Sequence, residues 1–279
     1  MIEIGLTGWS DHELINPNPK RKLEDYSSHF PVVELDTSFY AIPSEKNIRS
    51  WIKKTPDVFQ FIPKAYSAMT KHKDWQQEYD SIKDMFARYK MAFEPMIASG
   101  KVKAFLFQFP PNFTCNREHV EYMRLVRRLM EDLPIAIEFR HASWYSEDFK
   151  EGTLNFLEEM SFIHVVVDQP QTPNNSVPFT PIATNPEQTI IRLHGRNYEG
   201  WLGENQKDDW RTLRTLYNYQ DEELEEIKQA ALNLEHNSKE VTVIFNNNSG
   251  GHAASNAKRL QEMLGIDFDG LGPRQIGLF

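Results

Sequence analysis

A chain of 279 residues that is 40% hydrophobic and 25% charged has the composition of an ordinary globular protein, not of a disordered or fibrous one. Its formal net charge of −9 argues against a general nucleic-acid-binding protein, because such proteins are more often basic. Cys115 is the single cysteine, so no intramolecular disulfide can form, as is typical of the reducing cytosol. The first residues lack the basic region of a signal peptide, and no apolar run approaches the roughly 18 residues of a membrane span. We therefore expect a cytoplasmic protein without a membrane partner.

Eight short apolar segments, rich in β-branched and aromatic residues, recur along the chain and predict strands. They cover residues 2–7, 32–36, 58–63, 103–109, 135–140, 162–168, 189–195 and 241–247. Helical patterns fill most of the intervals, whereas the proline-rich residues 169–188 predict an irregular loop. Strands that alternate with helices predict a parallel sheet, with a doubly wound open sheet as the rival. The count of eight and the absence of a GxGxxG motif after the first strand favour a single-domain (β/α)₈ TIM-like barrel over residues 1–279.

Capping residues and apolar spacing predict the helices between these strands. Ser44 is the expected N-cap of a helix over residues 44–54, and Ser146 that of a helix over residues 146–160. Longer amphipathic patterns run from Asp74 to about Ala98 and over residues 116–133, and a last helix is expected from about His252 to Leu264. The acidic run at residues 221–229 is typical of a solvated helix face.

The candidate site lies at the carboxyl ends of the strands, where barrels carry their chemistry. Side chains alternate across a strand with period two, so polar residues two positions apart share a face. Three such pairs end the predicted strands: Glu34 with Asp36, Glu138 with Arg140, and Arg192 with His194. The residues between the members of each pair are apolar, so we expect the polar pairs to point into the barrel. Charges there must pair or face a water-filled mouth, because burying an unpaired charge costs several kcal/mol.

These positions predict two sets of functional residues. The catalytic candidates are Glu138 or Asp168 as the general base and His194 as the acid. The substrate-binding candidates are Thr7, Trp9, Glu34, Asp36, Tyr40, Lys64, Gln108, Arg140, Arg192, Arg196, Asn246, Asn248, Gly250 and Gly251. Structural interpretations stay open for Glu34 as an ion-pair partner, for Asp36 as a loop cap and for Asp168 as a turn residue. They also stay open for Glu138 with Arg140 as a plain ion pair and for the asparagines as turn formers. His164 is interpreted as a buried structural histidine.

The stretch VIFNNNSGGHAASNAKRL, residues 243–260, places three asparagines and two glycines between the last strand and the last helix. Barrels often bind phosphate with the loops after strands seven and eight and a helix N-terminus. Gly250 and Gly251 would let backbone N–H groups approach an anion, and the helix dipole would favour negative charge. Gly195 and Arg196 are expected alongside. The pattern therefore predicts half of an anion-binding mouth.

A metal ion is disfavoured at this mouth because cations share the ring of strand ends. Two unit charges about 5 Å apart interact by roughly 3 kcal/mol at an effective dielectric of about 20, and a divalent ion doubles that. The cations concerned are Lys64, Arg140, Arg192 and Arg196. No HxxH or HExxH spacing occurs in the chain. The sequence favours a metal-free site, and it predicts no cofactor.

Motifs spread over nearly the whole chain resemble the YecE-like family, also called domain of unknown function 72. They are IGLTGWS, VVELDTSFYAIPS, FQFIPKAY, FLFQFPPNF, IEFRHASW, RLHGRN, NNNSGGHAASNAKRL and GPRQIGLF. The resemblance implies a TIM-barrel-like fold with the motif residues gathered at one end, and it implies no particular reaction. Asp36 stands where the family pattern commonly has Asn, and residues 198–210 depart from that pattern as an individual elaboration.

Three functions follow from this reading. The first is an enzyme that acts by general acid–base chemistry on a small anionic ligand, such as a phosphorylated sugar or nucleotide, as a hydrolase, lyase or isomerase. The second is a metal-assisted phosphodiesterase, for which nucleic acid is a conceivable but not favoured partner. The third is a non-catalytic protein that binds a phosphorylated metabolite.

Overall fold

A computed structural model describes residues 1–15, 18–173, 176–202 and 210–273. The strands are β1 (Ile2–Thr7), β2 (Val32–Leu35), β3 (Gln60–Pro63), β4 (Phe105–Gln108), β5 (Ile135–Glu138), β6 (Ile163–Asp168), β7 (Gln188–Leu193) and β8 (Glu240–Phe245). The α-helices are α1 (Lys22–Tyr26), α2 (Thr37–Tyr40), α3 (Glu45–Lys54), α4 (Ile82–Ala98), α5 (Arg117–Met130), α6 (Lys150–Glu159), α7 (Tyr198–Leu202), α8 (Trp210–Thr215), α9 (Asp221–Glu235) and α10 (His252–Leu264). Two 3₁₀ helices, η1 (Ala142–Tyr145) and η2 (Ser249–Gly251), follow β5 and β8.

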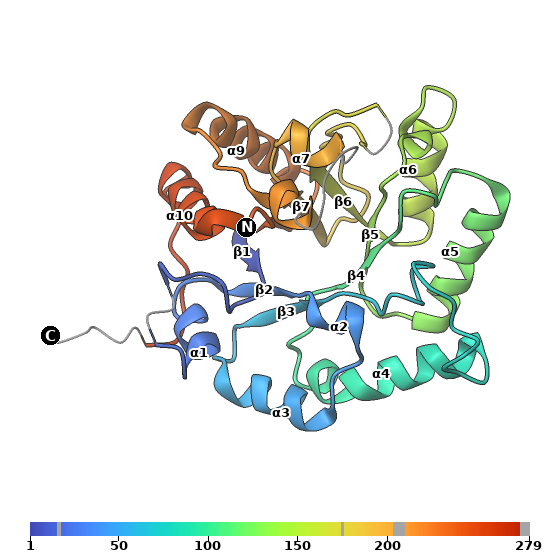
Figure 1. Ribbon diagram of the computed structural model, residues 1–279, viewed down its shortest axis with the longest axis horizontal. Coiled ribbons are helices and arrows are strands. Elements are labelled where there is room, and N and C mark those ends of the chain that lie inside the picture. Colours follow the sequence, from blue (N-terminus) through green and yellow to red (C-terminus); the bar gives the residue numbers. More distant parts are fainter. Residues whose placement is uncertain (16–17, 174–175, 203–209, 274–279) are drawn as a thin grey trace, which may run out of the picture.

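The strands form one parallel sheet that closes on itself, with helices around it (Figure 1). The strand order is β3-β2-β1-β8-β7-β6-β5-β4, so β1 pairs with β8 across the two ends of the chain. The remaining seam between β3 and β4 is narrow and is bridged by the parallel pairs Phe61 with Val102 and Lys64 with Leu106. The predicted (β/α)₈ TIM-like barrel is therefore confirmed.

The strands form where expected because each apolar run is covered on both faces, by the barrel interior and by the surrounding helices. Every residue of β2, β5 and β6 is buried. The predictions for β2, β5, β7 and β8 run one or two residues too far at the carboxyl end, where polar residues leave the sheet to line the mouth. The predictions for β3, β4 and β6 begin one or two residues too early. The proline-rich segment is irregular as predicted, over residues 169–173 and 176–187.

Two helix starts differ from the sequence prediction. The Ser44 side chain accepts the Asn47 N–H, as predicted for an N-cap. The helix expected from Asp74 begins only at Ile82, because Ser81 caps α4. Ser146 does not cap α6: its hydroxyl donates to the Ser143 carbonyl, and α6 starts four residues later. The last helix matches its predicted bounds.

In the ranges described above, no helix has both the length and the apolar character needed to cross a bilayer.

The amino end of the barrel interior is filled by an ion-pair cluster on Lys103. Its ammonium group lies 2.5 Å from Glu3 and 2.7 Å from Glu240, which come from β1 and β8. It also donates to the side-chain oxygen of Gln60 on β3. The Lys103 cluster therefore packs the interior at this end, and the cavity described below lies at the carboxyl ends of the strands.

Tyr26 of α1 joins the first two strands. Its ring is fully buried, and its hydroxyl accepts the Leu6 N–H and donates to the Val32 carbonyl, both at 2.8 Å. Since Leu6 lies in β1 and Val32 in β2, this hydroxyl satisfies one backbone group on each strand. Buried backbone groups without a partner are rare, so the bridge fixes how α1 packs on the sheet.

Tyr26→Phe is expected to lower the free energy of unfolding by about 1–3 kcal/mol, because it leaves a buried N–H and a buried C=O without partners. Urea denaturation of the wild type and the variant measures this difference. Tyr40→Phe is the matched control, since the Tyr40 side chain is 62% exposed, and it should change stability by less than about 0.5 kcal/mol. Equal effects of the two changes would contradict the role assigned to the Tyr26 hydroxyl.

Candidate functional site

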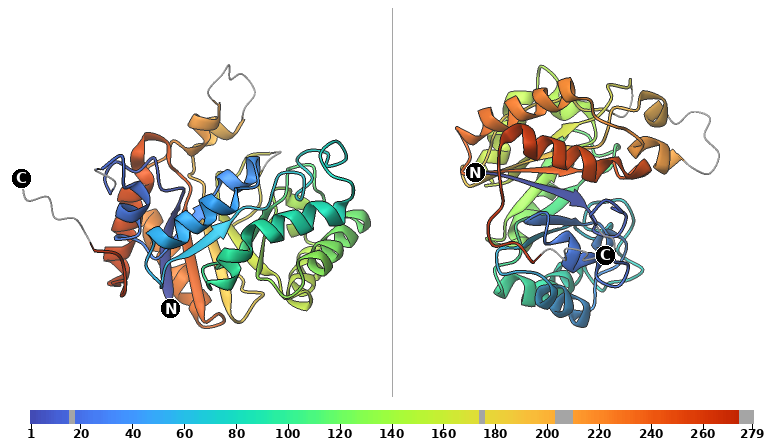
Figure 2. Two further views of the ribbon diagram at one scale, coloured as in Figure 1. Left: turned by 90° about the horizontal axis from the view of Figure 1, so that it is seen from below. Right: turned by 90° about the vertical axis from the view of Figure 1, so that its left-hand side faces the viewer.

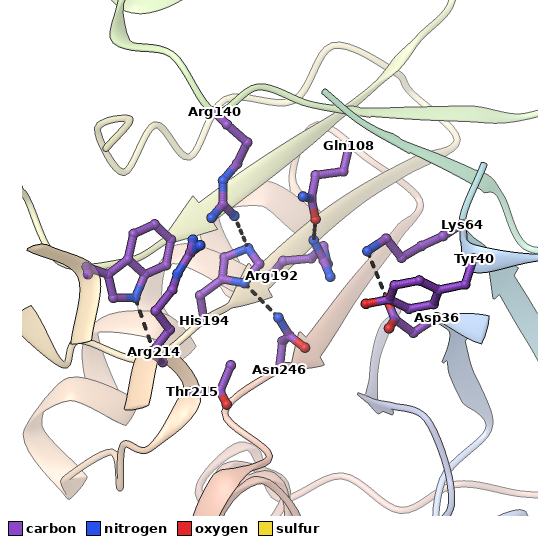
Figure 3. Close-up of a pocket in the computed structure, with 11 residues that line it drawn as sticks. Asp36, Tyr40, Lys64, Gln108, Arg140, Arg192, His194, Arg214, Thr215 and Asn246 are labelled. Carbon is purple, nitrogen blue, oxygen red and sulfur yellow. Dashed lines mark hydrogen bonds and ion pairs between the residues drawn. The ribbon is translucent and has the colours of Figure 1, made fainter. Parts of the chain in front are cut away.

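The carboxyl ends of the strands surround one cavity of about 220 Å³ (Figure 3). Most of the lining comes from side chains at or just beyond the ends of six strands, and the rest from α2, α7 and α8. The lining residues are Asp36, Tyr40, Lys64, Gln108, Arg140, Arg192, His194, Trp201, Arg214, Thr215 and Asn246. Eight of these eleven belong to the candidate set read from the sequence.

Arg192 of β7 lies at the floor of the cavity and holds the barrel interior together. Its Nε and Nη2 atoms donate to the two Glu34 oxygens, each at 2.7 Å. Its Nη1 atom donates to a Glu138 oxygen and, at 3.2 Å, to Gln108. Burial disfavours the charged form, but Glu138 and Glu34 outweigh this and raise the pKa of Arg192. The guanidinium thus joins β2, β4, β5 and β7 across the barrel.

Glu138 lies below the cavity, not on its surface. Its side chain is fully buried, and its Oε1 atom accepts from Arg140 Nη1 at 2.8 Å while Oε2 accepts from Arg192. Burial acts to raise the pKa of Glu138, but Arg192, His194 and Arg140 prevail and hold it well below its usual value. A carboxylate that is already fully hydrogen-bonded and strongly acidic orients its neighbours and is poorly suited to abstract a proton.

His194 lies between Glu138 and Asn246. Its Nε2 atom lies 3.1 Å from both Glu138 Oε1, which can only accept, and Arg140 Nη1, which can only donate. The Asn246 amide nitrogen, a donor, faces Nδ1 and so places the proton on Nε2, towards Glu138. Its Nδ1 atom is then unprotonated and accepts from the Asn246 amide at 2.8 Å. Burial, with Arg140 and Arg192 opposing Glu138, lowers the pKa of His194 to about 3. The imidazole is therefore neutral and fixed in one tautomer.

Lys64 and Asp36 form the opposite wall of the cavity. They follow β3 and β2, and the Lys64 ammonium group lies 2.8 Å from Asp36 Oδ1. Lys64 also rests over the Phe39 ring, 4.6 Å from its centroid. Asp36 is the one carboxylate among the described residues that line the cavity, and Tyr40 stands beside it at the exposed rim (Figure 3).

The sequence analysis missed three lining residues: Trp201 of α7 and Arg214 and Thr215 of α8. These two short helices project beyond the carboxyl end of the barrel, seen in orange in Figure 2, left. The interval between β7 and α9 is long and carries tryptophan and arginine, and that signal could have identified it as part of the mouth. It was instead interpreted as an individual elaboration, of which residues 203–209 lie outside the described residues.

Asp168 and Arg196, both predicted for the site, pair with each other away from the cavity lining. Arg196 donates to both Asp168 oxygens at 2.9–3.1 Å and lies within 3.3 Å of Glu223 and Glu226 of α9. The Tyr219 hydroxyl donates to Asp168 at 2.6 Å. This cluster fastens the ends of β6 and β7 to α9, so Asp168 has no oxygen left for a ligand in the cavity.

The three asparagines that follow β8 have three different partners. Only Asn246 reaches the cavity, where it donates to His194. Asn247 donates to the Tyr217 carbonyl, and Asn248 donates to the Thr7 carbonyl. The triplet therefore positions one catalytic candidate and ties the turn to two neighbouring segments. Neither Thr7 nor Trp9 lines the cavity; Trp9 packs edge-on against Trp51 at 5.5 Å.

Gly250 and Gly251 lie outside the cationic cavity. They have φ angles of 73° and 75°, which side-chain-bearing residues rarely adopt, so the turn into α10 itself explains the glycine pair. They border a separate hollow with Asn248, in which Asp11 and Glu13 also take part. Lys22 also lines this hollow, so the two carboxylates outnumber its one cation and leave no excess of positive charge for the anion that the sequence analysis expected at this helix N-terminus.

The described residues contain no group of three or more histidine, cysteine, aspartate and glutamate side chains placed to hold a metal ion. His164, interpreted as structural, is fully buried between the Tyr145 hydroxyl and the Ile182 carbonyl, which confirms that interpretation. The cavity is thus a concave, mostly polar site in which cations outnumber carboxylates. Such a lining can bind an anion and stabilise negative charge.

Fold and site together define a class: an α/β barrel with a small cationic cavity at the carboxyl ends of its strands. The chain belongs to the family described as "Protein of unknown function DUF72", whose model matches residues 3–276. The first five residues of the closing motif GPRQIGLF, residues 272–276, fall within that match in sequence, although residues 274–279 lie outside the described residues.

Relatives of this family agree with the assignment. The chain is 48% identical to the UPF0759 protein YunF of Bacillus subtilis over the full length of both. It is 28% identical to the UPF0759 protein YecE of Escherichia coli over 56% of this chain and 54% of that protein. A crystal structure of a DUF72 family protein of Enterococcus faecalis superposes with a TM-score of 0.94 at 42% identity, covering 99% of this chain and 100% of that one. One from Thermotoga maritima gives 0.81 at 31% identity, over 95% and 100%.

Arg192→Met is expected to lower the free energy of unfolding by about 3–5 kcal/mol at neutral pH, because it leaves two buried carboxylates without their cation. Burial already raises the pKa of Glu34 beside Arg192, so without Arg192 both carboxylates should bind protons above their unfolded pKa. Groups with a raised folded pKa stabilise below the unfolded pKa and lose that contribution as pH rises. The difference in unfolding free energy between the wild type and Arg192→Met should therefore shrink as the pH falls towards about 4.5.

Urea denaturation at neutral pH and near pH 4.5 measures both effects. Arg88→Met is the matched control, because it removes an arginine from an exposed ion pair with Asp84 on α4. It should cost less than about 1 kcal/mol. Either of two results would contradict this account of the barrel floor. One is that Arg192→Met lowers the free energy of unfolding no more than Arg88→Met does, and the other is that its loss grows as the pH falls.

Proposed function

We propose that the cavity binds a small anionic metabolite and that the protein acts on it by general acid–base chemistry. The observation that carries the proposal is the convergence of Lys64, Arg140, Arg192 and Arg214 on one cavity of about 220 Å³. The carboxylates nearby are engaged: Asp36 by Lys64, and Glu34 and Glu138 by Arg192. An anion would complete the charge balance of a buried cationic surface.

The size of the cavity limits what enters it. Pockets for drug-sized ligands typically measure about 300–1,000 Å³, so about 220 Å³ suits the anionic group and the few atoms next to it. The rest of a larger ligand would extend past Tyr40, whose side chain is 62% exposed at the rim. A phosphorylated sugar fits this description, and a nucleotide would place only its phosphate inside.

The same geometry supports roles that differ from the initial assignment. His194 is the group best placed to take a proton, through Nδ1, if a ligand displaces the Asn246 amide. Glu138 then acts as a positioning residue, because its carboxylate holds Nε2 and would stabilise the imidazolium that forms. Burial is the main cause of the low pKa of His194, and the positive field of Arg140 and Arg192 adds to it. An anion beside Arg140 would offset that field and so raise the pKa of the base part of the way.

Small anions are expected to stabilise the protein. Arg140→Gln is expected to weaken their binding roughly 10- to 100-fold, because it removes about one charge-assisted hydrogen bond. Inorganic phosphate, sulfate, phosphorylated trioses and small carboxylates form the test panel. Thermal unfolding and calorimetric titration measure binding, since a ligand at 100 times its Kd stabilises by about 2.7 kcal/mol.

Arg88→Gln serves as the control for Arg140→Gln, because it removes an arginine that pairs with a carboxylate on the outer surface of the barrel. It should leave anion affinity within about twofold of the wild type. Native mass spectrometry of protein taken directly from cells would identify a co-purified anion. A wild type that no anion in the panel stabilises, even at low ionic strength, would exclude the proposal.

His194→Gln is expected to retain anion binding within about threefold and to lower turnover roughly 10²- to 10⁴-fold, as removal of a general base does. Turnover of phosphate monoesters and of phosphorylated sugars, followed by product analysis, provides the measurement. His236→Gln, at an exposed residue beyond α9, is the control. Equal turnover in His194→Gln and wild type would contradict the catalytic role, and ligand binding without turnover in the wild type would favour a non-catalytic metabolite-binding protein.

A further inference from the structure

Lys64 and Asp36 are held in place at one wall of the cavity. The Lys64 ammonium group lies 2.8 Å from Asp36 Oδ1 and 4.6 Å from the centroid of the Phe39 ring. The Lys64 backbone carbonyl accepts hydrogen bonds from the hydroxyls of Ser38, at 2.7 Å, and Tyr89, at 2.9 Å. Both of these residues are buried, so the backbone that carries the ammonium group is firmly anchored.

This pair has hydrogen-bonding capacity that the protein does not use. An ammonium group has three N–H donors, and among the described residues Lys64 uses one of them, for Asp36 Oδ1. Asp36 Oδ2 accepts no hydrogen bond from any residue in the same ranges, and the Asp36 side chain is 35% exposed. Both side chains line the cavity, so these donors and this acceptor are available to a ligand.

The unused groups suit a neutral hydroxyl group better than a charge. The pair has no net charge: an anion placed here would be repelled by Asp36, and a cation would be repelled by Lys64. A hydroxyl group has one donor and two acceptor lone pairs, so it can donate to Asp36 Oδ2 while it accepts from Lys64. Hydrogen bonds to charged groups are stronger than those between neutral groups, so the contact is selective.

Tyr40 extends the same wall. Its side chain is 62% exposed, and its one ring contact among the described residues is an edge-to-face contact with Phe39 at 5.2 Å. Asp36, Lys64 and Tyr40 lie on the side of the cavity opposite Arg140 (Figure 3). A ligand with its anionic group beside Arg140 would place its neutral atoms against the polar pair and this aromatic ring. Such a combination suits a hydroxylated carbon chain, whose C–H groups pack on the ring.

We propose that Asp36 and Lys64 bind a hydroxyl group of the ligand, which makes the substrate a hydroxylated anion, such as a sugar phosphate, a polyol phosphate or a hydroxy acid. An anion of the same size without hydroxyl groups would displace water from Asp36 Oδ2 and Lys64 without replacing its hydrogen bonds. A site that is built to bind a hydroxyl group discriminates against such an analogue. This inference rests on the proposed function and adds the substrate class to it.

The wild-type protein tests the inference with matched pairs of probes at constant ionic strength. Glycerol 3-phosphate is compared with n-propyl phosphate, and glycerate with propionate, because the members of each pair share their charge and carbon number but differ in hydroxyl groups. Calorimetric titration should show that the hydroxylated member of at least one pair has a Kd roughly tenfold or more lower, which corresponds to about one hydrogen bond to a charged group.

Asp36→Asn is the informative variant. Its amide oxygen can still accept from Lys64, but an NH₂ group replaces the free carboxylate oxygen and cannot accept from a hydroxyl group. The variant also removes a negative charge, which favours both members of a pair equally, so the ratio of their affinities is the quantity to compare. That ratio should fall below about threefold. Circular dichroism verifies that the variant is folded.

Asp84→Asn is the matched control. Asp84 also shares one oxygen with a cation, 3.0 Å from Arg88 Nε, and its side chain is 27% exposed, yet it lies on α4 and does not line the cavity. It should leave the preference for hydroxylated anions unchanged.

The outcomes separate this inference from the proposal on which it rests. If the wild type binds both members of each pair equally, or if Asp36→Asn keeps the wild-type ratio, Asp36 and Lys64 do not select a hydroxyl group and the anion-binding proposal still stands. If no member of either pair binds the wild type, the proposed function itself fails.

Discussion

The buried pairing of Arg192 with Glu34 and Glu138 is the constraint on which the carboxyl half of the barrel depends. Three charges in the interior of a closed sheet are stable only when each satisfies the others, because desolvation of an isolated charge is costly. Arg192 reaches both carboxylates from β7, and Glu138 in turn fixes Arg140 and His194. Hydrogen bonds inside the core therefore fix where Arg140 and His194 lie at the mouth of the barrel.

Above this floor the cavity is built from two kinds of element, strand ends and short helices. The strand ends contribute His194, Arg140 and Lys64, which are held by ion pairs or buried hydrogen bonds. The projecting helices α7 and α8 contribute Trp201 and Arg214, and Trp201 contacts both Arg140 and His194 of the barrel. Most lining residues therefore lie on the strand ends, and most of the others lie on the connection after β7, in the manner of barrels whose loops carry part of the site.

The sequence predicted the eight strands, their parallel order and most of the cationic residues, because period-two alternation identifies inward positions without coordinates. It could not rank the carboxylates. Glu138, Asp168 and Asp36 look alike at strand ends, yet Glu138 is buried under two arginines, Asp168 is taken by Arg196, and Asp36 alone faces the cavity. Which oxygen is free depends on partners that are distant in the chain.

The glycine pair and the projecting helices show the same division between sequence and structure. The sequence by itself determined that Gly250 and Gly251 form a turn, since local backbone conformation depends on local residue type. Only the tertiary structure decided that this turn faces a hollow with acidic residues, while residues around Trp201 and Arg214 complete the cationic cavity. The number of strands and the alternation of side chains along each strand follow from local, repeated patterns, so they can be predicted from the sequence. The balance of charge at a cavity is set by long-range contacts, and it emerges only when the ring of strands closes.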